Sequence, residues 1–217
     1  MLVTAIIMAV LSPILASYAV GFVNQEEFAL KIPLIKLKKG LHYIGLYIFL
    51  PVFYILFYLL RHIERIDLYF IQCYILIFFM AVIAIVDFEH KKIPNTVLIY
   101  MLAAWILSLI PQIALDFNAG VSLLAASLLG ALTGGGFFLL AYIISRKSIG
   151  GGDVKLMAVI GLYVTVYRIF PVMFYGMLAA SLVGLILILL KKINRKDTMP
   201  LSPFLFLGVC VTLLFMN

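Results

Sequence analysis

Charged side chains are scarce in this sequence. Only 12% of the 217 residues are Asp, Glu, Lys or Arg, whereas 66% are hydrophobic, and the mean hydropathy is +1.23. Soluble domains carry about 25% charged residues, so this composition excludes an ordinary soluble domain. Long apolar runs separated by short polar clusters indicate an integral membrane protein.

Cysteine and histidine are also rare. The two cysteines, Cys73 and Cys210, both fall within apolar runs, which excludes a disulfide framework and favours small buried side chains. The three histidines do not have the spacing of metal ligands. We therefore expect neither a metal nor a cofactor.

The apolar runs predict the fold class. A helix needs about 20 apolar residues to cross a bilayer, and the sequence contains about eight such runs. The prediction is an all-α, polytopic membrane bundle with about eight transmembrane helices. The predicted spans are 2–23, 43–60, 68–86, 96–114, 120–144, 154–168, 170–190 and 201–216. We expect span 2–23 to remain as a mature helix, because no basic residue precedes its apolar run.

The basic residues predict the orientation in the membrane. With the N-terminus outside, 13 of the 16 Lys and Arg residues fall on one side, and only Arg61, Arg65 and Arg168 fall on the other. The larger set is Lys31, Lys36, Lys38, Lys39, Lys91, Lys92, Arg146, Lys147, Lys155, Lys191, Lys192, Arg195 and Lys196. Short cytoplasmic loops carry an excess of such residues, so both termini are predicted outside. The net charge of +7 thus indicates a lipid bilayer as partner rather than nucleic acid.

Three polar segments precede the last pair of spans on the predicted cytoplasmic side. They are 24–42, 87–95 and 145–155, and none is long enough to form a separate domain. We expect one integral-membrane domain over 1–217, with a first helix and a short cytoplasmic loop in 1–42 and core helices in 43–217. Within the fifth span, the small residues of 130–136 (GALTGGG) predict close helix packing.

Two aspartates lie at the ends of apolar runs. Asp87 ends the run FFMAVIAIV, and Asp153 begins the run VKLMAVIGLYV. A carboxylate at the centre of a membrane helix costs about 2.5–3.5 kcal/mol, so both positions indicate a function. Two carboxylates at one membrane depth can share a proton. An aspartic protease uses such a pair, in which the ionised group takes a proton from water and the protonated group polarises the scissile carbonyl.

The glycines before Asp153 allow close approach. Gly150, Gly151 and Gly152 permit positive φ and carry no side chain, so a substrate backbone or the other aspartate could come near. A structural alternative makes Asp153 the N-cap of the following helix. Asp87 could likewise cap its helix or pair with Lys91 at i,i+4.

Three motifs carry a family resemblance. The segments DFEHKKIPN (87–95), GGGDVKL (150–156) and PLSPFLFLG (200–208) together resemble the type IV prepilin peptidases, membrane aspartic proteases of the GxGD class. The resemblance implies that Asp87 and Asp153 are catalytic and that the glycines of 150–152 form the active-site loop. Glu89, Pro94 and Lys155 are candidate supporting residues.

The resemblance also implies a reaction and its location. It predicts an enzyme of the cytoplasmic (inner) membrane that removes the short basic leader from type IV prepilins or pseudopilins at the cytoplasmic face. Many bacterial members carry two CxxC pairs in the loop after the first helix and also methylate the new N-terminus. The corresponding segment here, 24–42, contains no cysteine, which excludes a zinc site there and puts methylation in doubt.

Two alternatives stay open. A proton- or ion-coupled transporter could use Asp87 and Asp153, although transporters place such residues near the midplane of the bilayer and often in inverted repeats. Both aspartates lie toward one predicted face, and no inverted repeat is evident. A non-enzymatic membrane assembly factor could also hold the two aspartates for structural reasons.

Overall fold

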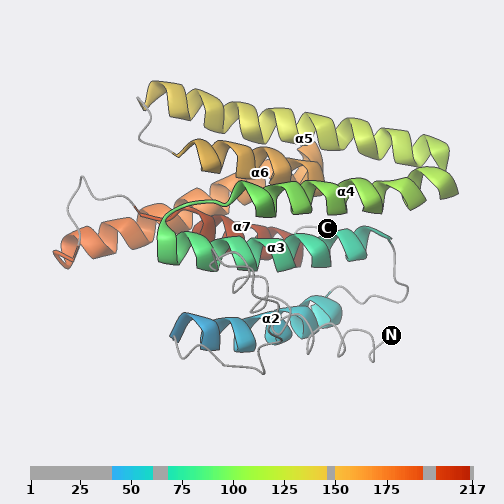
Figure 1. Ribbon diagram of the computed structural model, residues 1–217. Coiled ribbons are helices and arrows are strands. Elements are labelled where there is room, and N and C mark those ends of the chain that lie inside the picture. Colours follow the sequence, from blue (N-terminus) through green and yellow to red (C-terminus); the bar gives the residue numbers. More distant parts are fainter. Residues whose placement is uncertain (1–40, 61–67, 146–149, 193–198, 216–217) are drawn as a thin grey trace, which may run out of the picture. The chain divides into compact units, whose positions relative to one another are not determined.

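The computed structural model describes residues 41–60, 68–145, 150–192 and 199–215, and the regular elements in these ranges are α-helices (Figure 1). The helices are α2 (Leu41–Leu60), α3 (Leu68–His90), α4 (Asn95–Leu115), α5 (Phe117–Ile144), α6 (Gly151–Leu189) and α7 (Ser202–Phe215). The predicted all-α class is therefore confirmed. The predicted span 2–23 and most of the loop 24–42 lie outside the described residues.

The chain divides into two compact units, Met1–Ile66 and Asp67–Asn217. Helix α2, with Pro51 in its interior, is the described part of the first unit. Helices α3 to α7 belong to the second unit, which contains all the motifs considered below. One domain over 1–217 stays a prediction.

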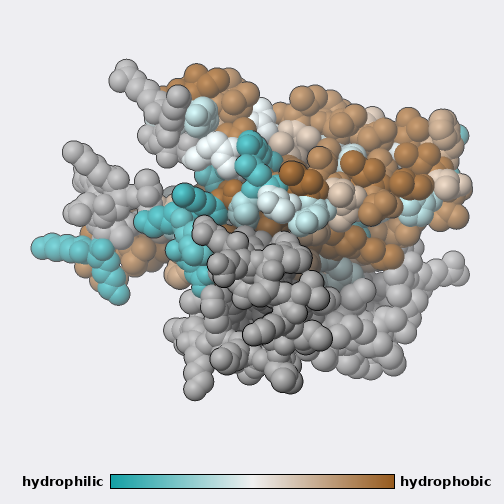
Figure 2. All heavy atoms as spheres, viewed as in Figure 1, coloured by the Kyte–Doolittle hydropathy of each residue, from teal (hydrophilic) through white to brown (hydrophobic). Residues whose placement is uncertain are grey.

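Within the described residues, four helices are long and apolar enough to cross a membrane. They are Phe70–His90, Asn95–Leu115, Phe117–Ile144 and Gly151–Leu189. The predicted spans agree with these helices within a few residues at most ends, but the number of eight is not confirmed. Large aliphatic side chains such as Ile99, Leu107, Leu140 and Ile144 are exposed. Much of the surface of the second unit is accordingly hydrophobic in Figure 2, as expected for contact with hydrocarbon.

Helix α6 reverses direction at Thr165, whose φ of 61° and ψ of 177° are not helical. A Cβ atom on Gly134 would lie 3.0 Å from the carbonyl oxygen of Met157 and 2.9 Å from Cγ1 of Ile169. Twelve residues of straight helix (169 − 157) span about 18 Å, so both contacts require the second arm of α6 to fold back on the first, as Figure 1 shows.

The predicted break between the sixth and seventh spans is therefore misplaced. It was predicted at 168–171, whereas the helix breaks at Thr165 and Pro171 lies inside the second arm. Proline near the start of a helix costs few hydrogen bonds, because the first amides have no partner within the helix. Pro171 lies six residues after Thr165, beyond these first amides, so it removes one hydrogen bond from the second arm.

Glycines allow α6 to approach its neighbours closely. A Cβ atom on Gly130 of α5 would overlap the carbonyl oxygen of Gly161, and one on Gly161 would overlap the carbonyl group of Gly130. On another side of α6, a Cβ atom on Gly208 of α7 would lie 2.5 Å from the carbonyl oxygen of Val172 and 2.8 Å from the nitrogen of Gly176. The predicted close packing of 130–136 is confirmed, with α6 as the neighbouring helix.

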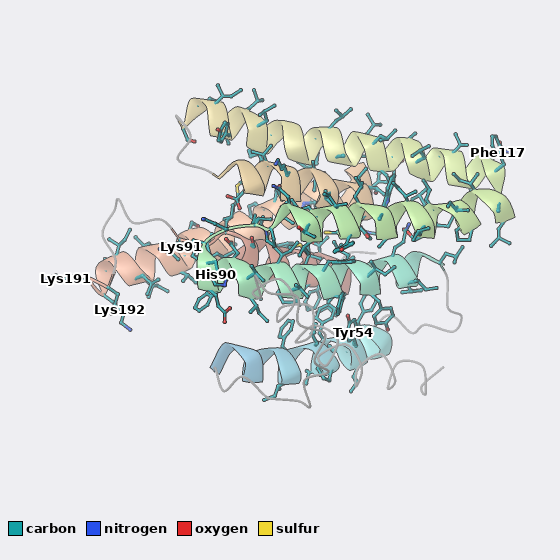
Figure 3. All side chains as sticks on the ribbon, viewed as in Figure 1. Tyr54, His90, Lys91, Phe117, Lys191 and Lys192 are labelled. Atoms are coloured by element: carbon teal, nitrogen blue, oxygen red, sulfur yellow. The ribbon has the colours of Figure 1, made fainter. Side chains whose placement is uncertain are left out.

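One end of the second unit collects the polar termini of several helices. Helices α3 and α5 end there, and α6 and α7 begin there (Figure 1). Figure 3 shows His90, Lys91, Lys191 and Lys192 toward this end and Phe117 at the opposite end. We call it the lysine end. Its position on the cytoplasmic side of a membrane stays a prediction.

Candidate active site

Asp87 lies in the last turn of α3, at the lysine end. The helix finishes at His90, and the N–H of Lys91 donates to the carbonyl oxygen of Asp87 at 2.7 Å. Lys91 has a φ of 51°, the left-handed conformation that commonly follows a helix end. The Asp87 residue is only 5% exposed. A buried carboxylate needs hydrogen-bond donors, so its partners decide what it can do.

The carboxylate of Asp87 has a remote partner. Its Oδ2 atom accepts a hydrogen bond of 3.0 Å from the backbone N–H of Ser202, which is 115 positions later in the chain. Ser202 is the first residue of α7 and is fully buried. The sequence leaves open whether Asp87 caps its own helix or pairs with Lys91. The structure shows a backbone bond between those two residues and directs the Asp87 carboxylate to α7.

Asp153 lies in the first turn of α6. The N-cap residue is Gly150, with extended φ and ψ of −70° and 140°, and its carbonyl oxygen accepts from the N–H of Asp153 at 3.1 Å. In return, the N–H of Gly150 donates to Oδ2 of Asp153 at 3.2 Å. The alternative that Asp153 is itself the N-cap is therefore wrong. Its carboxylate reaches back from the third helical position, as the acidic residue of a capping box does.

The glycines of 150–152 matter because they lack a side chain, and not because they adopt a positive φ. None of the described glycines has a positive φ, so that part of the prediction is wrong. A Cβ atom on Gly150 would lie 3.0 Å from Oδ2 of Asp153, and one on Gly152 would lie 3.1 Å from Cβ of Ile93. Gly151 faces open space, with nothing within 4 Å of such an atom. The missing side chains thus bring the loop close to Asp153 and to Ile93.

The two aspartate motifs meet at the lysine end. Gly152 packs against Ile93, and Nζ of Lys155 donates to Oδ1 of Asn95 at 3.0 Å. The carboxyl groups of Asp87 and Asp153 are close enough for the charge of the first to act on the second. Residues 66 positions apart (153 − 87) therefore lie at one site.

The candidate supporting residues have separate structural positions. Oε2 of Glu89 lies 3.8 Å from Nε2 of His90, next to the end of α3. Pro94 is the N-cap residue of α4, and its carbonyl oxygen accepts from the N–H of Val97 at 3.2 Å. Lys155 contacts Asn95, as described above. Catalytic and supporting roles for these residues stay predictions.

No group of three His, Cys, Asp or Glu side chains in the described part of the chain could hold a metal ion. The described site offers carboxyl groups, backbone amides and a neighbouring lysine. A pair of carboxyl groups can act as general acid and general base.

Ser202 was not singled out from the sequence. Segment 200–208 belongs to a quoted motif, but the contact to Asp87 is made by a backbone amide, which leaves no side-chain signal. The only available hint is Pro203, since proline near the start of an apolar run indicates the beginning of a helix. A helix start presents free N–H groups, and these could have been considered as partners for a buried carboxylate.

Comparisons with known proteins agree with the motifs. The model of the type IV leader peptidase family matches residues 74–189, more than half of the chain, and this range includes Asp87 and Asp153. A prepilin leader peptidase/N-methyltransferase of Bacillus subtilis (strain 168) is 28% identical over 142 residues, covering 63% of this chain and 52% of that protein. The match thus spans about half the length of this relative. No solved structure matches the chain. The chain belongs to the type IV leader peptidase family.

Proposed function

We propose that this protein is an aspartic endopeptidase that removes the leader peptide from type IV prepilins or pseudopilins. The observation that carries the proposal is the meeting of the two aspartate motifs at one end of an apolar helical bundle, where Gly152 packs against Ile93 and Lys155 donates to Asn95. Membership of the leader peptidase family supports the reaction, and the name of the Bacillus subtilis relative supports a prepilin as the substrate.

The reaction would follow the chemistry of a carboxyl pair. One carboxylate takes a proton from a water molecule as the water oxygen bonds to the scissile carbonyl carbon, and the protonated partner gives its proton to the carbonyl oxygen. When the C–N bond breaks, one hydroxyl group of the tetrahedral intermediate gives its proton to the ionised carboxylate, and the leaving nitrogen takes a proton from the other carboxyl group and departs as an amine. The products are the leader with a new carboxyl terminus and the mature subunit with a new amino terminus.

The position of the site fits a substrate that is anchored in the membrane. Asp87 and Asp153 lie near the helix ends, where a cleavage site next to a hydrophobic helix could reach them. The lysine end carries Lys91, Lys191 and Lys192, and the excess of lysine supports a cytoplasmic location in the inner membrane. A transporter would be expected to hold such carboxylates near the bilayer midplane, so no observation favours that alternative.

Cleavage in cells tests the proposal. A candidate prepilin is co-expressed with the wild type or with the Asp87→Asn or Asp153→Asn variant, and leader removal is followed on a gel. Asparagine has nearly the same shape as aspartate, but its amide group cannot take up or give up a proton in the reaction. We expect the wild type to cut the precursor and both variants to leave it intact.

Asp116→Asn is the matched control. Asp116 is the N-cap residue of α5, at the opposite end of the second unit, and its carboxylate accepts from the N–H of Ala119 at 3.0 Å. This control should cleave at the wild-type rate. Normal cleavage by Asp87→Asn or Asp153→Asn would overturn the mechanism, and an uncut precursor with the wild type would overturn the function.

A further inference from the structure

In the first turn of α7, Ser202 carries the one backbone N–H group that does not donate within the helix. Leu201 precedes the helix, and its carbonyl oxygen accepts from the N–H groups of Phe204 at 3.0 Å and Leu205 at 3.1 Å. Pro203 has no N–H group. The N–H of Ser202 therefore lies before the helical hydrogen-bond ladder, and it donates to Oδ2 of Asp87 at 3.0 Å.

The bond between Ser202 and Asp87 differs from the one that Asp153 receives. Ser202 and Asp87 are both buried, and the bond joins two segments that are remote in the sequence. Asp153 accepts at 3.2 Å from Gly150 within its own exposed turn. Burial strengthens a hydrogen bond to a charged group. The start of a helix favours negative charge at both carboxylates, because Asp153 lies in the first turn of α6, so burial is what distinguishes them. The stronger support for a negative charge is therefore at Asp87.

Helix α7 holds this amide on a rigid support. Gly208 of α7 packs directly on the backbone of Val172 and Gly176 in α6, with no room for a Cβ atom. Leu205, one turn after Ser202, is also fully buried and lies against Gly176. Because the backbones are in direct contact, the start of α7 has little freedom to move relative to α6.

The side chain of Ser202 does not explain the contact. Its Oγ atom is buried and has no hydrogen-bond partner among the described residues. Removing an unpaired hydroxyl group costs no hydrogen bond. A variant without the hydroxyl therefore separates the backbone contribution from that of the side chain.

We infer that Ser202 is a positioning residue whose backbone N–H holds Oδ2 of Asp87 and makes Asp87 the ionised member of the pair. This inference rests on the proposed function. Oδ1 of Asp87 is then the atom that accepts the proton from water, and Asp153 is the protonated partner that donates to the carbonyl oxygen. The start of α7 is thus a third element of the active site, beside the two aspartate motifs.

The test removes the N–H group and leaves the rest of the site in place. Ser202→Pro removes the N–H group at the first position of the helix, where proline is well tolerated. An ester in place of the amide, introduced with an α-hydroxy acid at position 202, does so without adding a ring. Ser202→Ala keeps the amide and serves as the control. Cleavage of a purified prepilin is measured in detergent, with kcat and KM determined separately.

We expect the proline and ester variants to lower kcat about 10- to 100-fold, which is the loss of one hydrogen bond to a charged group, with KM within about twofold. Ser202→Ala should keep kcat within about twofold. The thermal midpoint gives a second measurement: the ester should lower it in the wild type and much less in an Asp87→Ala background, because the partner is then absent.

Four results would overturn the inference. An unchanged kcat with a lowered thermal midpoint would show that Asp87 only caps α7. An equal loss of kcat in Ser202→Ala would assign the effect to the side chain. If Ser202→Pro cleaves as fast as the wild type while Asp87→Asn does not cleave at all, the role of Ser202 fails and the proposed function stands. Absence of cleavage by the wild type would overturn both.

Discussion

Lys155 of α6 donates a hydrogen bond from Nζ to Oδ1 of Asn95, the first residue of α4, at 3.0 Å. The bond joins the two aspartate motifs across 60 positions of sequence. Lys155 follows Asp153 by two residues, so the bond ties the start of α6 to the loop that follows Asp87. Both side chains are exposed, which limits the free energy that the bond contributes.

Replacing Lys155 and Asn95, singly and together, measures how much their hydrogen bond contributes to the free energy of unfolding. We expect Lys155→Met and Asn95→Ala each to lower the free energy of unfolding, with a coupling of about 0.5–1 kcal/mol in the double variant. Denaturant titration in detergent gives the values. Lys192→Met, a change at another lysine of the same end, is the control and should leave stability unchanged. Additive effects of the two replacements would show that the bond contributes nothing.

Alanine substitutions at two neighbouring glycines of the active-site loop should have opposite effects on stability. A Cβ atom at Gly152 would lie 3.1 Å from Cβ of Ile93, whereas one at Gly151 would meet nothing within 4 Å. Gly152→Ala should lower the free energy of unfolding by about 1 kcal/mol or more, since overpacking exceeds the gain in helix propensity. Gly151→Ala should leave stability unchanged or raise it. Equal thermal midpoints for the two variants would contradict the packing described at Ile93.

A second glycine pair tests the contact between α5 and α6. Gly130→Ala places a methyl group onto the backbone of α6 at Gly161, so we expect a loss of about 1–3 kcal/mol in unfolding free energy. Gly136 lies on the same helix with nothing within 4 Å of its added Cβ atom. Gly136→Ala should therefore be neutral or stabilising by up to about 1 kcal/mol. If Gly130→Ala unfolds at the wild-type midpoint, the helices do not cross there.

The N-terminus of the processed subunit provides a prediction about methylation. Segment 24–42 has no cysteine. The resemblance described above includes many bacterial members that carry CxxC pairs in this loop and also methylate. We expect the mature subunit to carry an unmodified amino terminus. Mass spectrometry of the cleaved product decides the point, and a mass higher by one methyl group would show that the activity is present without those cysteines.

The helices of the second unit could be predicted because each must supply its own backbone hydrogen bonds within hydrocarbon. An apolar run of sufficient length therefore becomes a helix with little influence from its neighbours. The runs 68–86 and 96–114 correspond to α3 and α4 within a few residues. The reversal at Thr165 could not be predicted, because threonine gives no turn signal and Arg168 and Pro171 offered a plausible break nearby.

The carboxylates of the site were visible in the sequence because a charge at the end of an apolar run is costly and is retained for a reason. Their surroundings were not visible. The contact of Ile93 with Gly152, the bond between Lys155 and Asn95 and the amide of Ser202 at Asp87 all join segments that are remote along the chain.

The sequence by itself determined the helical class, the two aspartates and the glycines beside one of them. Apolar length, the cost of burying charge and the absence of a side chain are properties of single positions or short runs. Only the tertiary structure decided which backbone N–H group donates a hydrogen bond to each carboxylate. A backbone amide is present at nearly every residue, so its partner depends on where the chain folds and not on which residue carries the amide.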